Sequence, residues 1–274
     1  MSSSTTDRYC VIGNPVAHSK SPQIHAAFAA QTGQSIEYGR RMAPLDGFAD
    51  VVRDLIAKGY RGANVTVPFK LEAAGLATRL EERARAAGAV NTLSFIDGEI
   101  VGDNTDGPGL VADIVRNAGV ALAGKRILLL GAGGAARGVM LPFLQQGPKA
   151  ILVANRTRAT ADALVADFQD QVTEVKACGF EDIRGAFDIV VNATSASLSQ
   201  EMPPVPASAF TKDTLALDMM YGDQPTPFMQ FAAKQGARTR DGFGMLVEQA
   251  AEAFAIWRGV RPDTHDFLTT LRTK

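Results

Sequence analysis

The feature of this sequence that most constrains its fold is an apolar run leading directly into a glycine-rich segment. Residues 125–130 read KRILLL, and residues 131–136 read GAGGAA. A buried strand followed by G-x-G-x-x-A at the start of a helix is the fingerprint of a dinucleotide-binding domain. Gly131 permits the tight turn, Gly133 lets the backbone approach a pyrophosphate, and Ala136 permits close packing of the helix on the strand. The segment therefore predicts a Rossmann-like domain.

The residues that follow the next strands indicate which dinucleotide is bound. The expected strand 150–154 is followed by Asn155, Arg156 and Thr157, without the carboxylate that would hold the ribose 2′-hydroxyl of NAD. The guanidinium of Arg156 instead suits a 2′-phosphate in charge and geometry, so the sequence favours NADP. Thr194 lies beyond the end of a later strand and should edge the same cofactor, because ligands bind outside the carboxyl ends of parallel strands.

Strands and helices also alternate before this domain. Strands are expected near residues 9–13, 39–42, 62–70, 88–95 and 100–102. Helices are expected near residues 22–32, 48–58, 71–76 and 80–87. This alternation predicts an α/β protein with a mainly parallel sheet. The glycine- and acid-rich segment 102–109, GDNTDGPG, reads as a loop or hinge between two blocks.

Composition narrows the possible partners and the compartment. A chain of 274 residues with 46% hydrophobic residues suggests two globular domains. The net charge is −1 and basic residues form no block, so neither nucleic acid nor a membrane is an expected partner. The two cysteines, Cys10 and Cys178, lie in apolar stretches and fit reduced core thiols of a cytoplasmic protein rather than a disulfide or metal site. No stretch has the length of a membrane span, and the polar N-terminus does not resemble a signal peptide.

Two charged residues stand at loop positions where chemistry is possible. Lys70 ends the alternating segment 64–70, NVTVPFK, after Asn64 and Thr66. By itself, a lysine beyond a strand is usually a solvated surface charge. Asp106 lies in the hinge segment, where it is equally suited to capping the helix that follows.

Hydroxyl and amide side chains offer further candidates. Ser21 followed by Pro22 predicts a helix start, with the serine as N-cap and the proline as the first helical residue. Ser19 adds a second hydroxyl, and two hydroxyls beside a helix N-terminus can seat a carboxylate; plain capping is the alternative. Gln249 lies on a helix with apolar residues at helical spacing, where it would ordinarily be a surface or interface residue.

Nine motifs along the chain, in this order and spacing, resemble the NADP-dependent shikimate dehydrogenase family. They are SKSP at 19–22, NVTVPFK at 64–70, AVNT at 89–92, GDNTDG at 102–107, GAGGAARG at 131–138, NRT at 155–157, NATSAS at 192–197, DMMY at 218–221 and GFGMLVEQ at 242–249. The resemblance implies a substrate-binding domain over residues 1–105 and a Rossmann-like NADP-binding domain over residues 106–242. Helices over residues 243–274 would return to the first domain, with the site in the cleft between the domains.

The resemblance also implies the reaction and the residues that carry it. The enzyme would reversibly reduce 3-dehydroshikimate to shikimate with NADPH, in chorismate and aromatic amino acid biosynthesis, without a metal. The catalytic pair would be Lys70 and Asp106, with either as the formal acid–base. Other substrate-binding residues would be Ser19 and Ser21 for the carboxylate, Asn64, Thr66, Asn91 and Gln249 for ring hydroxyls, and Tyr221. The cofactor residues would be Gly131, Gly133, Gly134, Ala135, Asn155, Arg156, Thr157, Thr194, Met219 and Gly242.

Two departures and two alternatives accompany this resemblance. The second arginine after NRT is Arg158 rather than a later residue, which favours a 2′-phosphate contact from Arg156 over a two-arginine clamp. The NATSAS segment lacks a glycine common soon after it in relatives, which should alter only the local loop. The alternatives are a quinate/shikimate dehydrogenase with broader substrate and cofactor use, and a non-catalytic dinucleotide-sensing protein. A monomer and a homodimer are equally compatible with the sequence.

Overall fold

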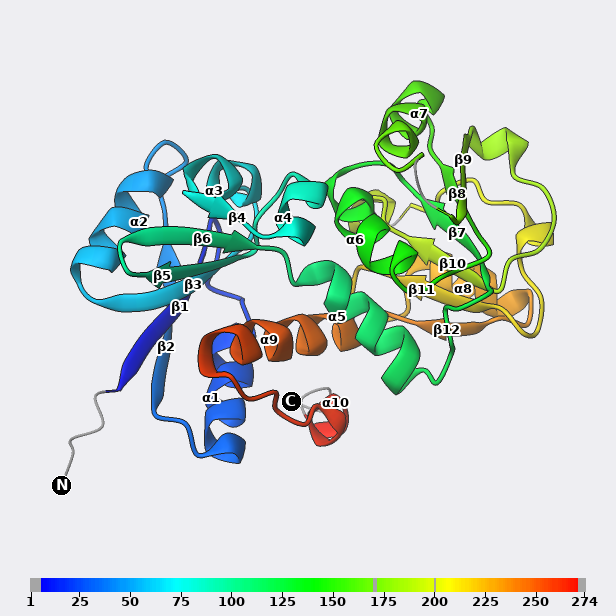
Figure 1. Ribbon diagram of the computed structural model, residues 1–274. Coiled ribbons are helices and arrows are strands. Elements are labelled where there is room, and N and C mark those ends of the chain that lie inside the picture. The colour runs from blue at the N-terminus through cyan, green and yellow to red at the C-terminus, as the bar shows by residue number, and fades with distance from the viewer. Residues whose placement is uncertain (1–5, 170–171, 200, 271–274) are drawn as a thin grey trace. The chain divides into compact units, whose positions relative to one another are not determined.

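The computed structural model describes residues 6–169, 172–199 and 201–270 (Figure 1). The chain forms two compact units. The first unit comprises Met1–Gly109 and Val247–Lys274, and the second comprises Leu110–Leu246. The chain passes from one unit to the other within two helices, α5 (Asp106–Ala112) and α9 (Phe243–Arg258).

The first unit contains a six-stranded mixed sheet in the order β2-β1-β3-β5-β6-β4. Its strands are β1 (Asp7–Gly13), β2 (Ile36–Met42), β3 (Tyr60–Val65), β4 (Arg79–Leu80), β5 (Thr92–Ile96) and β6 (Glu99–Asp103). Strands β2 and β3 both pair with β1 in parallel, and β4 pairs with β6 in parallel. Strand β5 runs antiparallel to both β3 and β6. The parallel core of the sheet brings the ends of β1 and β3 to one edge.

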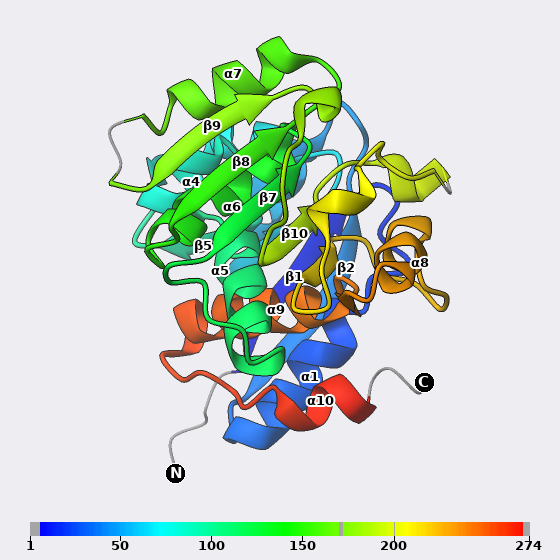
Figure 2. The same ribbon diagram turned by 90° about the vertical axis from the view of Figure 1, so that its right-hand side faces the viewer.

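The helices that cover this sheet are α1 (Ser21–Thr32), α2 (Phe48–Ala57), α3 (Lys70–Leu76), α4 (Glu82–Ala87) and α9. Helix α10 (His265–Thr270) packs on α1, where the rings of Phe267 and Phe28 meet at a centroid distance of 5.1 Å. Helices α1 and α9 lie side by side (Figures 1 and 2), and the rings of Phe28 and Phe254 meet between them at a centroid distance of 5.9 Å. Trp257 of α9 stacks on Tyr9 and donates from Nε1 to the backbone carbonyl of Leu93 at 3.1 Å. The C-terminal helices therefore belong to the core of the first unit.

The second unit is built on a fully parallel sheet in the order β12-β11-β10-β7-β8-β9, whose strands are labelled in Figure 1. The strands are β7 (Arg126–Leu130), β8 (Ala150–Ala154), β9 (Glu174–Cys178), β10 (Ile189–Asn192), β11 (Leu215–Asp218) and β12 (Arg238–Arg240). The main helices are α6 (Gly134–Leu144), α7 (Arg158–Ala166) and α8 (Pro227–Lys234). Read from β9, this strand order is 3-2-1-4-5-6, the doubly wound dinucleotide-binding topology. The predicted Rossmann-like fold is confirmed.

Several predicted element boundaries were wrong. Strand β3 ends at Val65 rather than Lys70, because the next residues form a turn in which the Phe69 amide donates to the Thr66 carbonyl, and Lys70 then begins α3. Helix α1 begins at Ser21, so Lys20 rather than Ser21 occupies the N-cap position. Ser21 is thus the first helical residue. Its amide donates to the Ser19 hydroxyl oxygen at 3.3 Å, whereas the N-cap residue Lys20 makes no side-chain capping bond.

In the described part of the chain, no helix combines the length and apolarity that a membrane crossing requires. Over the same residues, no group of three or more His, Cys, Asp or Glu side chains is arranged to hold a metal ion.

Candidate active site

The centre of the candidate site is an ion pair between two helix starts. Lys70 begins α3 and Asp106 begins α5, and the distance from Lys70 Nζ to Asp106 Oδ2 is 2.6 Å. The two side chains are 34% and 22% exposed, so the pair is partly sheltered yet open to a small molecule. Lys70 is therefore an ion-paired, partly sheltered lysine, in contrast to Lys58, whose pair with Asp54 is exposed.

Asn91 fixes the second oxygen of this carboxylate. Its Nδ2 donates to Asp106 Oδ1 at 2.9 Å and to Thr105 Oγ1 at 3.0 Å. Its own Oδ1 accepts from the Thr105 amide at 2.8 Å. Gln249 of α9 joins the group, with its Oε1 3.4 Å from Asn91 Nδ2. Both carboxylate oxygens of Asp106 thus accept from N–H donors, and this arrangement suits an ionised carboxylate as hydrogen-bond acceptor.

Asn64, at the end of β3, is held in one orientation by its neighbours. Tyr38 of β2 donates from its hydroxyl to Asn64 Oδ1 at 2.7 Å. Asn64 Nδ2 donates to the Asn91 carbonyl at 3.2 Å and to Thr92 Oγ1 at 3.1 Å. Tyr38 was not predicted to lie at the site. The sequence shows only that it directly precedes the expected strand 39–42.

Ser19, Ser21 and Thr66 lie at the same edge of the sheet. Ser19 and Ser21 follow β1, and the backbone carbonyl of Ser19 accepts from the guanidinium of Arg40 at 2.6 Å. Thr66 follows β3, and its amide donates to the Ile12 carbonyl at 2.9 Å. A Cβ on Gly13 would lie 2.5 Å from Thr66 Cγ2, so the glycine leaves the space that this threonine occupies. The sheet therefore gathers the predicted substrate-binding residues of this unit at one edge.

The second unit carries a separate pocket of about 490 Å³ around the glycine-rich turn. Seven of the predicted cofactor residues line it: Gly131, Gly133, Gly134, Ala135, Asn155, Arg156 and Thr194. Three others, Thr157, Met219 and Gly242, are not among the lining residues. Phe180, Ser199 and residues 201–204 also line it and were not predicted. A proline-rich loop follows β10, and no feature of its sequence indicates that it lines a pocket with the glycines.

The geometry of this pocket fits a dinucleotide. Gly131 has φ of +99°, and an added Cβ would meet the Ala193 carbonyl oxygen at 3.2 Å. An added Cβ on Gly133 or Gly134 would meet no atom within 4 Å, so the backbone at the start of α6 faces open space where a phosphate can approach. Arg156 is exposed and lines the pocket, whereas Arg158 lies 3.5 Å from Asp162 on its own helix. Of these two arginines, Arg156 is therefore the one that lines the pocket.

The remaining predicted residues of this unit lie beyond β11. Gly242 approaches Met219 so closely that a Cβ on it would lie 2.1 Å from the Met219 carbonyl oxygen. The ring of Tyr221 is 41% exposed and packs edge-on against Phe243 at 6.2 Å. These contacts place the two segments 219–221 and 242–243 together within this unit.

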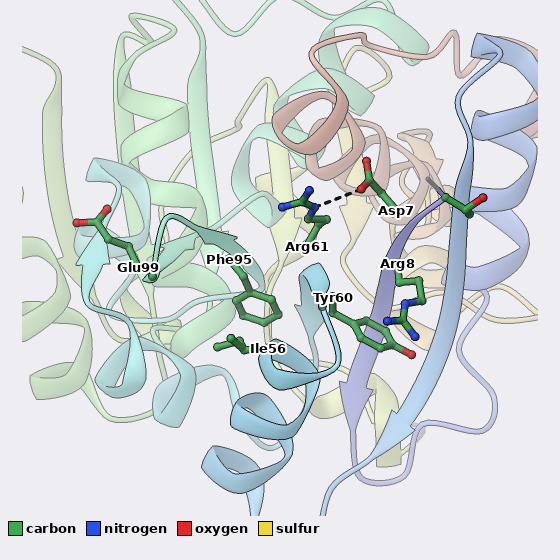
Figure 3. A pocket seen from close by; sticks show the side chains of 10 residues that line it. Asp7, Arg8, Ile56, Tyr60, Arg61, Phe95 and Glu99 are labelled. Carbon is green, nitrogen blue, oxygen red and sulfur yellow. Dashed lines mark hydrogen bonds and ion pairs between the residues drawn. The ribbon is translucent and has the colours of Figure 1, made fainter. Parts of the chain in front are cut away.

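A larger hollow of about 540 Å³ lies in the first unit (Figure 3), at the opposite ends of the strands. Asp7, Arg61 and Tyr60 line it where β1 and β3 begin. Asp7 and Arg61 form an ion pair at 3.2 Å, and Glu99 at the rim lies 3.5 Å from Arg79. Its charged groups therefore already have partners, and it contains none of the residues expected to act on substrate.

The fold and these two sites define a dinucleotide-dependent oxidoreductase of the Rossmann-like class. Three family models match the chain: the shikimate dehydrogenase substrate binding domain at residues 11–93, shikimate / quinate 5-dehydrogenase at 113–201, and the shikimate 5′-dehydrogenase C-terminal domain at 242–272. The shikimate dehydrogenase (NADP(+)) of Janthinobacterium sp. (strain Marseille) is 61% identical over 272 residues, which is 99% of each chain. The chain belongs to the shikimate dehydrogenase family, and it is an NADP-dependent enzyme of aromatic amino acid biosynthesis.

Solved structures agree with this assignment. The Ael1 enzyme from Pseudomonas putida is 50% identical, with a TM-score of 0.93 and coverage of 97% of this chain and 98% of its own. Shikimate 5-dehydrogenase from Thermus thermophilus, solved in complex with NADP(H) and shikimate, is 33% identical with a TM-score of 0.84. That match covers 94% of this chain and 96% of the Thermus chain.

Proposed function

We propose that Lys70 and Asp106 handle the proton in the reversible, NADPH-dependent reduction of 3-dehydroshikimate to shikimate. The observation that carries this proposal is the 2.6 Å contact between Lys70 Nζ and Asp106 Oδ2 in a partly exposed setting. NADPH supplies the hydride to the carbonyl carbon. The carbonyl oxygen must gain a proton at the same time, and the ammonium group of Lys70 is a donor that can provide or relay it.

Each member of the pair has a distinct task in this scheme. The positive charge of Lys70 stabilises negative charge that develops on the substrate oxygen during hydride transfer. Asp106 aims the ammonium group, and it can accept a hydrogen bond from the product hydroxyl. Asn91 keeps Asp106 in place through the 2.9 Å bond to Oδ1. In the oxidative direction the same groups take the proton from the hydroxyl of shikimate.

The other polar residues at this edge of the sheet would bind and orient the substrate. Ser19 and Ser21 stand at the start of α1, where free N–H groups and hydroxyls favour the substrate carboxylate. Asn64, Thr66, Asn91 and Gln249 would bond to ring hydroxyls, with Tyr221 as a further contact. Support for Asn64 comes from its fixed orientation, because an amide held by Tyr38 is aimed before substrate arrives.

The second unit would hold NADP through its pocket and its neighbouring loops. The pyrophosphate would lie at the start of α6, against Gly133, Gly134 and Ala135. Arg156, with Asn155 and Thr157, would bind the 2′-phosphate. The nicotinamide would lie near Met219 and Gly242, with Thr194 at the cofactor edge. We thus propose that the first unit binds the substrate and that the second unit binds NADP.

The test is to replace Lys70 by alanine and to measure shikimate oxidation with NADP. Turnover should fall by at least about 100-fold, whereas KM for shikimate should change far less, because removing an acid–base group costs about 10²- to 10⁴-fold in rate. Lys58→Ala is the matched control, because Lys58 is an exposed lysine that pairs with Asp54 on α2. A collapse of affinity with turnover preserved would make Lys70 a binding group only. Parallel assays with quinate and with NAD define the substrate and cofactor range.

Compartment and assembly state complete the proposal. Both cysteines are free and buried, which supports a reducing compartment, the cytoplasm. A monomer or a homodimer is proposed in solution, and sedimentation equilibrium distinguishes the two.

A further inference from the structure

Five side chains of alternating charge form a series of ion pairs in the first unit. In order, they are Asp103, Arg83, Glu252, Arg261 and Glu248. Arg83 of α4 stands second in this series. Its Nε and Nη2 donate to the two carboxylate oxygens of Asp103 at 2.7 and 2.9 Å, and its Nη1 donates to Glu252 Oε1 at 2.9 Å. The side chains of Asp103 and Arg83 are 10% and 24% exposed. Arg83 therefore joins the end of β6 to helix α9 through three bonds.

Hydrogen bonds of Asn104 connect Asp103 to Asp106. Asp103 Oδ1 also accepts from the Asn104 amide at 2.7 Å, and the Asp103 carbonyl accepts from the Asn91 amide at 3.1 Å. Asn104 Oδ1 then accepts from the Asp106 amide at 3.1 Å, and Asn104 Nδ2 donates to the Ala89 carbonyl at 3.0 Å. Asp103 and Asn104 are both buried. The carboxylate held by Arg83 thus fixes the backbone from which the Asp106 side chain projects.

On the other side of Arg83, the bond to Glu252 holds helix α9 in place. Glu252 lies one turn beyond Gln249, so the Arg83 contact bears on the helix segment that presents Gln249 to Asn91. Arg261 donates to Glu252 and, at 2.7 Å, to Glu248 Oε2. Glu248 is fully buried, and its other oxygen accepts from Thr264 Oγ1 at 2.6 Å. The far end of the series of ion pairs is therefore a structural anchor for α9 and the C-terminal segment.

We propose that Arg83 is a positioning residue for the proton-handling pair. By bonding Asp103 and Glu252 together, it holds the Asp106 loop and the Gln249 helix in the mutual register that the Lys70–Asp106 contact requires. Only a guanidinium can make this arrangement, because its planar fork donates to both oxygens of Asp103 while a third N–H reaches Glu252. The inference rests on the proposed roles of Lys70 and Asp106.

Arg83→Lys is the test, because it keeps the charge and loses the fork. We expect kcat for shikimate oxidation to fall by about 10- to 100-fold, the range that a misplacement of about 1 Å produces. The KM for NADP should stay within about twofold, because the cofactor residues lie in the other unit. The pH profile of kcat should also shift, since the setting of the Asp106 carboxylate changes. Circular dichroism and NADPH binding show that the variant is folded.

Arg261→Lys is the matched control. Arg261 belongs to the same series of ion pairs but contacts Glu248 and Glu252, not Asp103. It should lose unfolding free energy as Arg83→Lys does, yet keep kcat within about twofold and leave the pH profile unmoved.

Two results would overturn the inference. One is an Arg83→Lys enzyme with unchanged kcat. The other is an equal loss of kcat in both variants, in proportion to their loss of stability, which would make Arg83 a structural residue. The underlying proposal fails separately: if Lys70→Ala keeps its turnover, the roles of Lys70 and Asp106 are wrong. If Lys70→Ala loses turnover and Arg83→Lys does not, only the positioning role of Arg83 is refuted.

Discussion

Replacing His25 with phenylalanine should flatten the dependence of stability on pH. His25 lies on α1 with no exposed surface, and its ring stacks on Tyr38 at 4.1 Å with an interplanar angle of 5°. Among the residues that the structure describes, neither ring nitrogen has a hydrogen-bond partner. Burial lowers the pKa of His25 to about 3; the nearby Asn64 amide opposes this shift weakly, although it makes no hydrogen bond with the ring. The histidine is therefore held neutral in the folded protein at neutral pH.

The sign and size of the effect follow from the two pKa values. In the unfolded chain the pKa of His25 is about 6.5. Below pH 6.5 the unfolded state therefore binds a proton that the folded state does not, so stability falls as pH falls and stops falling near pH 3. At about 1.4 kcal/mol per pH unit, the loss between pH 7 and pH 5 is about 2 kcal/mol. Phenylalanine cannot bind the proton, and its ring preserves the stack on Tyr38.

Urea unfolding at pH 7, 6 and 5 measures the difference. The chain has one tryptophan, Trp257, whose ring centroid lies 5.6 Å from that of His25, so its fluorescence reports on this unit. The unfolding midpoint is the quantity to compare, because histidine protonation can change the intensity itself. His18→Gln is the control, since His18 is exposed. If the wild type and His25→Phe lose the same unfolding free energy between pH 7 and pH 5, the reasoning about His25 is refuted.

Two further predictions concern the second unit. Arg156→Ala should raise KM for NADP by about 10- to 100-fold and leave assays with NAD nearly unchanged, because it removes the charged contact that we propose to the 2′-phosphate. Arg158→Ala should have little effect on either KM, because Arg158 pairs with Asp162, and equal effects in the two variants would contradict the assignment. Asp113→Ala should destabilise this unit by about 3–5 kcal/mol, because Asp113 is fully buried and its removal leaves the Arg240 guanidinium without its carboxylate partner. Calorimetry measures the change in unfolding free energy, and a loss below about 1 kcal/mol would contradict the prediction.

The second unit was the more predictable part because its signal is local. The strand at 126–130, the turn at Gly131 and the helix start at Gly134 are consecutive in sequence, so one pattern predicts all three. Strands β9 and β12 were not predicted. Strand β12 has three residues, all polar, at the edge of the sheet, so no apolar pattern marks it.

The site in the first unit could be assembled from the sequence only through the resemblance. Lys70 and Asp106 are 36 positions apart, and no periodicity relates them. The pair forms because β6 turns back beside β5, which brings the end of β6 to the end of β3. Arg83 shows the same limit more strongly, since its partner Glu252 is 169 positions away. Contacts of this kind depend on strand register, and register is set by the whole sheet.

The two crossings of the chain, within α5 and α9, have a consequence for how the protein is made. The second unit is one continuous segment, Leu110–Leu246, inserted into the first. A ribosome therefore releases the whole of this segment before it releases Phe254 and Trp257, which the core of the first unit requires. Domains generally fold as units during synthesis. We therefore expect the second unit to fold in the nascent chain before the first unit is complete. This order holds although synthesis of the first unit begins earlier, because its last helices are made at the end.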